Sequence, residues 1–448
     1  MVYLYLLFRK TAMSNSKFKV GICGGGIGGL CAALALSRYD DIDVDVYESA
    51  SSFSEVGVGI GIWPRVWQIL KELGLEDALL KVALEQPSNS EVPTFNYRKS
   101  DQTSGIDITT MYAKSGGLKP FYRPDFLNVL LQHLPDRFNL YVEKRLTSYT
   151  LSATGSVEMQ FANNTLATCD LLIGADGIKS TVRRTLFTRE AQHCGDESRA
   201  TEIKSTIDAV WSGITAYRSV IPTDVLSKHY PNHPIFTQPT HYLGRNAHVI
   251  AYPIAQGRLV NFAAFSARYD VDNPKFEGPW TSTAPKDELK DLFAGWEPSV
   301  LALVECTGDP LKWAIHTVKP LHSFVSSNEP VVLLGDASHA CEPFQGVGAG
   351  QAIEDAYILA AILGHQKTRK DNLIHMLSVY DEIRRSFATD VARRSRAAGK
   401  AFALHSEDLY FDPSKLQDLQ QLLESVRQRW EYVWDSTLRI DGNLKLIV

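Results

Sequence analysis

Residues 19–48 read KVGICGGGIGGLCAALALSRYDDIDVDVYE, and this stretch decides the fold. A short apolar run ends at Cys23, a glycine-rich turn follows, an apolar helical pattern begins at Leu30, and a second strand pattern ends at Glu48. In such a unit one glycine permits the tight turn, another lets a pyrophosphate approach the backbone, and a third lets the helix pack on the strand. The stretch therefore predicts a dinucleotide-binding unit.

The turn supplies the first candidate cofactor-binding residues, which are Gly24, Gly26, Ile27, Gly28 and Gly29. The helix that follows presents free N–H groups and a partial positive charge to the phosphates. Glu48 stands nineteen residues after Gly29, where a carboxylate can accept both ribose hydroxyls of an adenosine and would repel a 2′-phosphate. This motif fits FAD or NAD and does not separate them.

Two further glycine-containing motifs favour FAD. Residues 170–180 read DLLIGADGIKS, and residues 331–356 read VVLLGDASHACEPFQGVGAGQAIEDA. Asp336 follows a strand pattern, where its carboxylate can bond the ribityl chain of a flavin. The glycine-rich loop around Gly348 brings bare backbone N–H groups beside the flavin ring, where they can stabilise negative charge on its pyrimidine side. Three such turns in this order argue against the alternative that they are ordinary glycine turns without a ligand.

With these motifs the chain resembles the class A flavoprotein aromatic hydroxylases, the para-hydroxybenzoate hydroxylase-like superfamily, and within it the salicylate hydroxylases. The resemblance covers residues 18–434, and the further matching pieces are EVGVG at 55–59, LGL at 73–75, RPDF at 123–126, AYR at 216–218, WAIH at 313–316 and RWEYVW at 429–434. It implies FAD contacts, which are expected at Glu48, Gly61, Arg123, Asp336 and Ala349. It also places Asp176 where the family uses one carboxylate near both the flavin and the nicotinamide nucleotide.

The resemblance implies an FAD-dependent monooxygenase that hydroxylates a hydroxybenzoate-type aromatic acid with O2, with oxidative decarboxylation of salicylate to catechol or of 4-hydroxybenzoate to hydroquinone. NADH or NADPH would bind transiently, because no second dinucleotide motif is visible in the sequence. Two departures leave the substrate open: Phe344 stands where salicylate hydroxylases read Pro-His-Gln-Gly, and Arg65 stands where Pro-Asn-Ala is usual. A dearomatising or ortho-hydroxylating monooxygenase of a phenolic secondary metabolite is the alternative.

Arg218 and Tyr252 are the candidate catalytic residues, because they fall where some fungal relatives hold a phenolate oxygen. Arginine is always charged, and a tyrosine hydroxyl donates a directed hydrogen bond. The alternative is that Arg218 makes a structural ion pair and that Tyr252 belongs to the core. Trp211, His248 and Phe262 are candidates for an aromatic wall around the substrate.

The order of strand and helix patterns predicts an α/β fold. We expect a Rossmann-like FAD-binding domain, an inserted and mostly antiparallel β-sheet substrate domain, and C-terminal helices. Alternating apolar residues through 200–300, with a turn at Gln256-Gly257, indicate the antiparallel sheet. The expected boundaries are 13–195 and 319–403 for the two parts of the FAD-binding domain, 196–318 for the substrate domain, and 404–448 for a C-terminal helical segment.

The composition limits which other classes of protein fit the sequence. A net charge of -5 without a basic stripe argues against nucleic-acid binding. Six scattered cysteines, without Cys-x-x-Cys or His-x-x-x-His spacing, indicate reduced thiols, a cytoplasmic enzyme and no metal site. The apolar run in residues 1–12 is shorter than the roughly 20 residues of a membrane span. We therefore expect no stable membrane insertion and take Met13 as the functional start, with a weak membrane or organelle address as the alternative.

Two other classes of flavoprotein stay open at this point. One is an oxidoreductase that does not oxygenate, such as a reductase or halogenase relative. The other is a flavin-binding regulatory or redox-signalling protein. Substrate-stimulated oxidation of reduced nicotinamide, with an oxygenated product, separates the monooxygenase from both. We expect a monomer or a homodimer.

Overall fold

The computed structural model describes residues 16–53, 59–83, 90–269, 271, 275–406 and 410–435. The expectations for residues 1–12 and Met13, and most of the EVGVG piece at 55–59, lie outside these residues. The domain boundaries expected from the sequence stay a prediction.

A five-stranded parallel sheet brings the three glycine motifs together. Its strand order is β18-β11-β1-β2-β7. The bounds are β1 (Phe18–Cys23), β2 (Ile42–Tyr47), β7 (Asn139–Tyr141), β11 (Leu171–Gly174) and β18 (Val331–Leu333). Cys23 at the end of β1 pairs with Gly174 of β11 and Tyr47 of β2, so these strands end at the same edge. Ligands of open parallel sheets bind at that edge, which is where the motifs follow their strands.

An eight-stranded sheet carries the rest of the site, in the order β16-β17-β12-β15-β14-β13-β4-β5. The bounds are β4 (Val92–Lys99), β5 (Ile106–Ala113), β12 (Val210–Pro222), β13 (Thr240–Gly244), β14 (Ala247–Ile254), β15 (Leu259–Ala267), β16 (Thr281–Thr283) and β17 (Leu311–Thr317). All neighbours are antiparallel except β13 and β4. The hairpin expected at Gln256-Gly257 is confirmed, because Ile254 of β14 pairs with Leu259 of β15.

Two small sheets complete the strands: β3 (Gly59–Ile62) pairs with β6 (Lys119–Tyr122), and β8 (Leu146–Leu151), β9 (Val157–Phe161) and β10 (Leu166–Cys169) form the other. The helices are α1 (Ile27–Leu36), α2 (Pro64–Glu72), α3 (Glu76–Leu80), α4 (Arg123–Gln132), α5 (Thr181–His193), α6 (Glu197–Lys204), α7 (Thr223–His229), α8 (Lys286–Leu292), α9 (Pro298–Cys306), α10 (Asp336–His339), α11 (Gly348–Gly364), α12 (Leu373–Phe402), α13 (Leu416–Trp430) and α14 (Tyr432–Asp435), with short 3-10 turns at Pro234–Phe236 and Lys370–Asn372.

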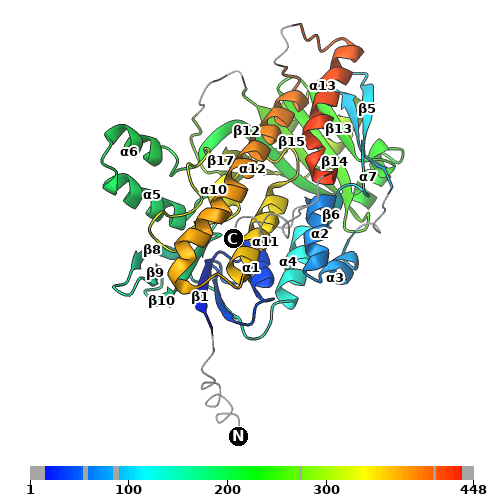
Figure 1. Ribbon diagram of the computed structural model, residues 1–448. Helices are drawn as coiled ribbons and strands as arrows, with labels where there is room; N and C mark the ends of the chain where they lie inside the picture. Colours follow the sequence, from blue (N-terminus) through cyan, green and yellow to red (C-terminus); the bar gives the residue numbers. More distant parts are fainter. Residues whose placement is uncertain are drawn as a thin grey trace.

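The long helix α12 connects the two halves of the molecule. It runs from the side of the parallel sheet, past α11, to α13 beside the eight-stranded sheet (Figure 1). The expected α/β class, with an antiparallel sheet and C-terminal helices, is confirmed. Among the helices that the structure describes, none is long and apolar enough to cross a membrane.

The eight-stranded sheet has two different faces because side chains alternate along each strand. On one face Val249, Val260 and Phe262 pack into an apolar core with residues of α7, α8 and α9. On the other face the next residues in each strand point toward α12 and α13 and toward a cavity. This alternation decides which residues of β14 and β15 can meet a ligand.

Candidate active site

The glycine turn after β1 leaves no room for side chains at two positions. Gly24 has a φ of +110°, and a Cβ there would lie 2.1 Å from the Ala175 carbonyl oxygen. A Cβ on Gly29 would lie 1.9 Å from the Gly24 carbonyl oxygen. Both positions therefore require glycine, as a turn that approaches a dinucleotide backbone demands.

Glu48 holds the outer side of this turn. One of its carboxylate oxygens accepts a 2.7 Å hydrogen bond from the Gly25 N–H, and the other accepts one of 2.7 Å from the Ala50 N–H. The carboxylate thus stands at the rim of the turn, on the wall of the cavity, in the position that the sequence predicts for a ribose contact.

Asp176 caps the helix that follows the second motif. Its carboxylate accepts hydrogen bonds from the Thr181 and Val182 N–H groups, at 2.7 and 3.1 Å, and from the Ser180 hydroxyl. Burial raises the pKa of Asp176, and these hydrogen bonds oppose the rise. The side chain therefore has a structural role at the start of α5 in addition to its place on the cavity wall.

The third motif supplies an exposed carboxylate and a helix N-terminus. Asp336 begins α10 directly after Gly335, whose φ is +62°, and its side chain is exposed on the cavity wall. Gly348 begins the 17-residue helix α11 and lines the cavity, and a Cβ there would meet nothing within 4 Å, so the helix begins beside open space. Its free N–H groups and partial positive charge suit an anionic group or a ring that gains negative charge.

One cavity of about 660 Å³ joins these turns to the inner face of the eight-stranded sheet. Every candidate cofactor-binding and catalytic residue from the sequence lines it except Gly29, which packs behind the turn. Arg123 and Arg218 reach it from α4 and β12. Burial lowers the pKa of both, the charge of Arg218 lowers that of Arg123 further, and Asp336 opposes the effect at Arg123. The volume lies within the usual range of ligand sites, roughly 300–1,000 Å³.

Arg218 and Tyr252 lie together on the sheet side of the cavity. Burial lowers the pKa of Arg218 and raises that of Tyr252, and each residue partly offsets the shift of the other. The Arg218 guanidinium lies 5.6 Å above the ring of Trp313, and its Nε has no hydrogen-bond partner within the described residues. Both side chains line the cavity, and Tyr252 also packs against the apolar cluster beneath this part of the sheet.

Of the three aromatic-wall candidates, only His248 lines the cavity. Phe262 is wrong because it lies on the opposite face of β15, with none of its surface exposed. Trp211 is wrong because it stands at a bulge of β12 and packs against Phe276. The wall residues that the sequence did not single out are Phe95, His241, Ile250, Asn261, Ala263, Phe265, Trp313 and Trp430. Because side chains alternate along a strand, the assignment of Tyr252 to the cavity would also have placed Ile250 there. No local sequence pattern indicates that β4 or α13 contributes to this wall.

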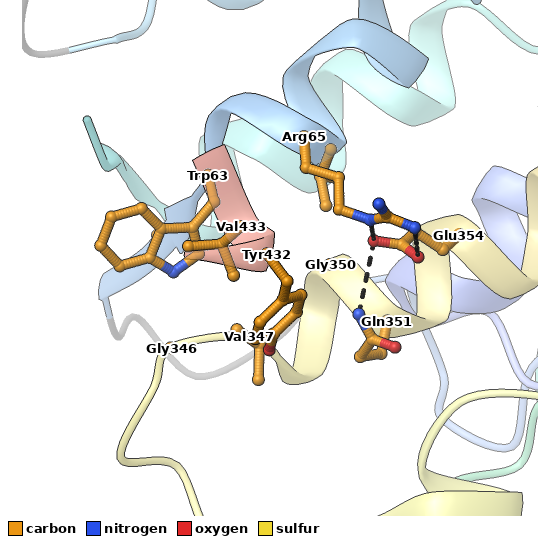
Figure 2. Close-up of a pocket in the computed structure, with 11 residues that line it drawn as sticks. Trp63, Arg65, Gly346, Val347, Gly350, Gln351, Glu354, Tyr432 and Val433 are labelled. Carbon is orange, nitrogen blue, oxygen red and sulfur yellow. Dashed lines mark hydrogen bonds and ion pairs between the residues drawn. The ribbon is translucent and has the colours of Figure 1, made fainter. Parts of the chain in front are cut away.

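A buried charge network fixes the third motif from behind. Arg65 forms a salt bridge with Glu354 at 2.8 Å (Figure 2). Both side chains line a pocket of about 10 Å³ between α2, α11 and α14. Arg384 contacts Asp355 at 2.6 Å, and Asp355 also contacts His339 at 2.6 Å. Arg65 therefore has a clear structural role at the position where the sequence departs from salicylate hydroxylases.

This network acts on the turn that carries Asp336. Asp355 accepts a 2.9 Å hydrogen bond from the Gly335 N–H. Burial works against ionisation of Asp355, but the charges of His339 and Arg384 hold its pKa well below the usual range. Within the described ranges, no three or more His, Cys, Asp or Glu side chains are grouped so that they could hold a metal ion.

The chain matches the family described as FAD binding domain over residues 17–240 and 314–395, and it belongs to that family. It is 35% identical to an FAD-dependent monooxygenase of Strobilurus tenacellus, over 94% of this chain and 95% of the relative. It is 34% identical to a salicylate hydroxylase of Pseudomonas putida, over 96% of this chain and 95% of the relative. A solved salicylate hydroxylase in complex with its substrate superimposes with a TM-score of 0.80 at 29% identity, covering 97% of this chain and 99% of the other.

The protein is accordingly an FAD-dependent monooxygenase of the salicylate hydroxylase type. FAD is its cofactor, and NADH or NADPH supplies the electrons, as is typical of the family. The glycines that exclude side chains and the helix N-terminus that faces open space fit this cofactor.

Proposed function

We propose that the enzyme hydroxylates a hydroxybenzoate-type aromatic acid at the ring carbon that bears the carboxylate, in the cytoplasm and as a monomer or homodimer. One oxygen atom of O2 enters the ring and the other leaves as water. The carboxylate leaves as carbon dioxide, and NADH or NADPH is oxidised. The products are catechol from salicylate or hydroquinone from 4-hydroxybenzoate. The observation that carries this proposal is the half-buried pair of Arg218 and Tyr252, which lines the same cavity as the glycine-rich turns.

The relatives support the choice of substrate class. Two salicylate hydroxylases of Pseudomonas putida are 33–34% identical to the chain. A 6-methylsalicylate 1-monooxygenase of Aspergillus terreus is 29% identical over 95% of the chain. All three names refer to hydroxybenzoic acids, which a half-buried arginine is suited to bind.

We infer that FAD is held by the residues that line the turns and the rim of the cavity: Gly24, Gly26, Ile27, Gly28, Glu48, Gly61, Arg123, Asp176, Asp336, Gly348 and Ala349, with Gly29 packing behind them. Bound there, FAD supplies the site at which reducing equivalents from NADH or NADPH activate O2. The helix N-terminus at Gly348 stabilises negative charge on the bound cofactor.

Arg218 and Tyr252 prepare the aromatic ring for oxygen transfer. Electrophilic oxygen transfer needs electron density that an ionised phenol supplies better than a neutral one. The Arg218 cation lowers the pKa of a phenol beside it, and the Tyr252 hydroxyl donates a hydrogen bond to the phenolate oxygen. The apolar and aromatic residues of the wall exclude water from this step.

The test is turnover of the FAD-loaded enzyme with NADH or NADPH and a panel of hydroxybenzoates. We expect one acid of the panel to stimulate nicotinamide oxidation, with one carbon dioxide released for each product formed. A phenolic product that retains its carboxyl group would contradict decarboxylation.

A second candidate is hydroxylation at a neighbouring ring carbon without loss of the carboxylate. It is favoured by a 3-amino-4-hydroxybenzoate 2-monooxygenase of Streptomyces platensis, which is 30% identical to the chain over 88% of its length. The same measurement separates the two, because the product mass then rises by one oxygen and no carbon dioxide appears.

A further inference from the structure

Strand β14 presents three side chains in a row to the cavity. His248, Ile250 and Tyr252 alternate along the strand, and all three line the cavity wall. At about 3.3 Å per residue, the backbones of His248 and Tyr252 lie roughly 13 Å apart. Arg218 and Tyr252 each act on the pKa of the other. The wall therefore has a second polar position, His248, at the far end from that pair.

His248 is held in one orientation by its neighbours. Its Nδ1 lies 2.8 Å from Nε2 of His241 on β13, which also lines the cavity. Its ring stacks on Phe265 at a centroid distance of 4.7 Å and meets the ring of Phe344 edge to face at 5.2 Å. The imidazole is thus clamped between aromatic rings of the cavity wall, and only its remaining nitrogen, Nε2, is left to bind a ligand.

The His241–His248 pair is neutral. Burial lowers the pKa of His248 to about 3, and burial together with His248 lowers that of His241 well below its usual value. One proton therefore lies between the two facing nitrogens, donated by one ring and accepted by the other. When His241 is the donor, His248 carries its own proton on Nε2 and can donate a hydrogen bond without being a cation.

His248 Nε2 is buried and has no hydrogen-bond partner among the described residues. Buried polar atoms in folded proteins are almost always paired, so an unpaired nitrogen on a ligand cavity calls for a partner from the ligand. In the protein without substrate the atom is covered, and Phe344 is the ring of the 340–347 segment that lies against it.

We propose that His248 donates a hydrogen bond from Nε2 to the carboxylate of the aromatic substrate, at the opposite end of the ring from Arg218 and Tyr252. This rests on the proposed function, since it places the phenol oxygen of the substrate at Arg218 and Tyr252. The contact forms as the Phe344 ring turns aside, and His241 is a positioning residue that sets the tautomer of His248. The carboxylate at the His248 end and the phenol oxygen at the Arg218–Tyr252 end must therefore lie on opposite sides of the substrate ring.

The substrate class that fits is a para-hydroxylated aromatic acid. The hydroxyl and carboxylate of salicylate are neighbours and lie within hydrogen-bond distance of one another, about 2.7 Å. Neighbouring groups are poorly matched to two positions whose anchoring backbones are roughly 13 Å apart. The two groups of 4-hydroxybenzoate point in opposite directions and can meet both ends.

The test is titration of the FAD-loaded enzyme with 4-hydroxybenzoate, salicylate and phenol, followed by the change in flavin absorbance. His248→Phe keeps the aromatic packing and removes the nitrogen. We expect it to weaken binding of 4-hydroxybenzoate about tenfold or more, the loss of one hydrogen bond to a charged group, and to change binding of phenol less than about twofold. His248→Gln, which retains a donor, should restore part of the affinity for 4-hydroxybenzoate.

The matched control is His233→Phe, because His233 is a buried histidine of the same half of the molecule that bonds the Ser299 carbonyl and is remote from the cavity wall. It should lower the midpoint of urea unfolding and leave the three dissociation constants unchanged. Equal effects of His248→Phe on 4-hydroxybenzoate and phenol, or no effect, would overturn the proposal. So would a wild-type enzyme that binds salicylate and not 4-hydroxybenzoate. Failure of the proposed function is a different result, in which acids bind but no acid of the panel is oxygenated.

Discussion

Arg218 and Tyr252 are the residues that we propose activate the substrate. Replacement of Arg218 by Ala removes the charge-assisted hydrogen bond that we propose to the substrate, which costs roughly 1.5–3 kcal/mol, or about one to two decades in rate. Tyr252→Phe should have a smaller effect in the same direction. Both variants should keep their FAD and should lose a larger share of electrons as hydrogen peroxide, because a poorly ionised ring reacts slowly.

Comparison of product formed with nicotinamide consumed, alongside a peroxide assay, measures this effect. Ser219→Ala is a suitable control, since Ser219 follows Arg218 on β12 and is absent from the cavity wall. Wild-type coupling in both Arg218→Ala and Tyr252→Phe would show that another group activates the ring.

At the residue scale the sequence predicted which side chains reach the cavity better beside the glycine turns than on the eight-stranded sheet. Glu48 and Asp336 follow strands of a parallel sheet, so the strand pattern alone places their side chains at one edge. The predictions for Trp211 and Phe262 were wrong because a bulge in β12 and the orientation of the β15 side chains decide which of them enter the cavity. His241 could not be predicted, since it becomes a wall residue only when β13 pairs with β14.

At the element scale, the turn between β1 and α1 has no room for a Cβ atom at Gly24 or Gly29. In Gly29→Ala the new methyl group would overlap the Gly24 carbonyl oxygen at 1.9 Å, so the turn must open and lose its phosphate-binding shape. We expect the purified variant to carry little or no FAD, measured by the ratio of flavin to protein absorbance. Gly308→Ala is the control, because nothing lies within 4 Å of its added Cβ. A Gly29→Ala protein with full FAD content would contradict this role of the turn.

The buried network between α11 and α12 predicts a second effect. Asp355→Asn removes one of the two carboxylates that pair with the buried Arg384. Because Glu354 stays at 3.1 Å from Arg384, the loss of stability should be smaller than the about 3–5 kcal/mol of a fully uncompensated buried charge. The Gly335 turn loses an acceptor at the same time, so FAD should be released more readily. Asp390→Asn, which breaks a partly exposed pair with Arg393 on α12, should cost less than about 1 kcal/mol.

The stability of the wild type should also depend on pH through Asp355. Its pKa is depressed in the folded protein, so its contribution is complete above the ordinary aspartate pKa of about 3.9 and is lost as the pH falls below it. Urea unfolding at several pH values should therefore show the gap between wild type and Asp355→Asn shrinking below about pH 4. A gap that is constant down to pH 2 would contradict ionisation of this buried carboxyl.

At the scale of the whole molecule, the active site exists only where distant parts of the chain meet. β4 near residue 95, the hairpin of β14 and β15, the turn at Asp336 and Trp430 of α13 all line one cavity. The sequence predicted the two kinds of sheet from local periodicity and turn residues. It did not predict that β4 and β5, which precede residue 195, complete the eight-stranded sheet, because strand pairing over more than a hundred residues leaves no local pattern.

The central claim is that the protein inserts oxygen from O2 into a hydroxybenzoate. The most direct measurement is a reaction of the FAD-loaded enzyme with NADH or NADPH, 18O-labelled O2 and the stimulating acid, followed by mass analysis of the phenolic product. We expect one labelled oxygen atom in each product molecule. Stimulated nicotinamide oxidation with an unlabelled or unchanged aromatic acid, and all reduced oxygen recovered as peroxide, would contradict the claim and indicate a flavoprotein oxidoreductase that does not oxygenate.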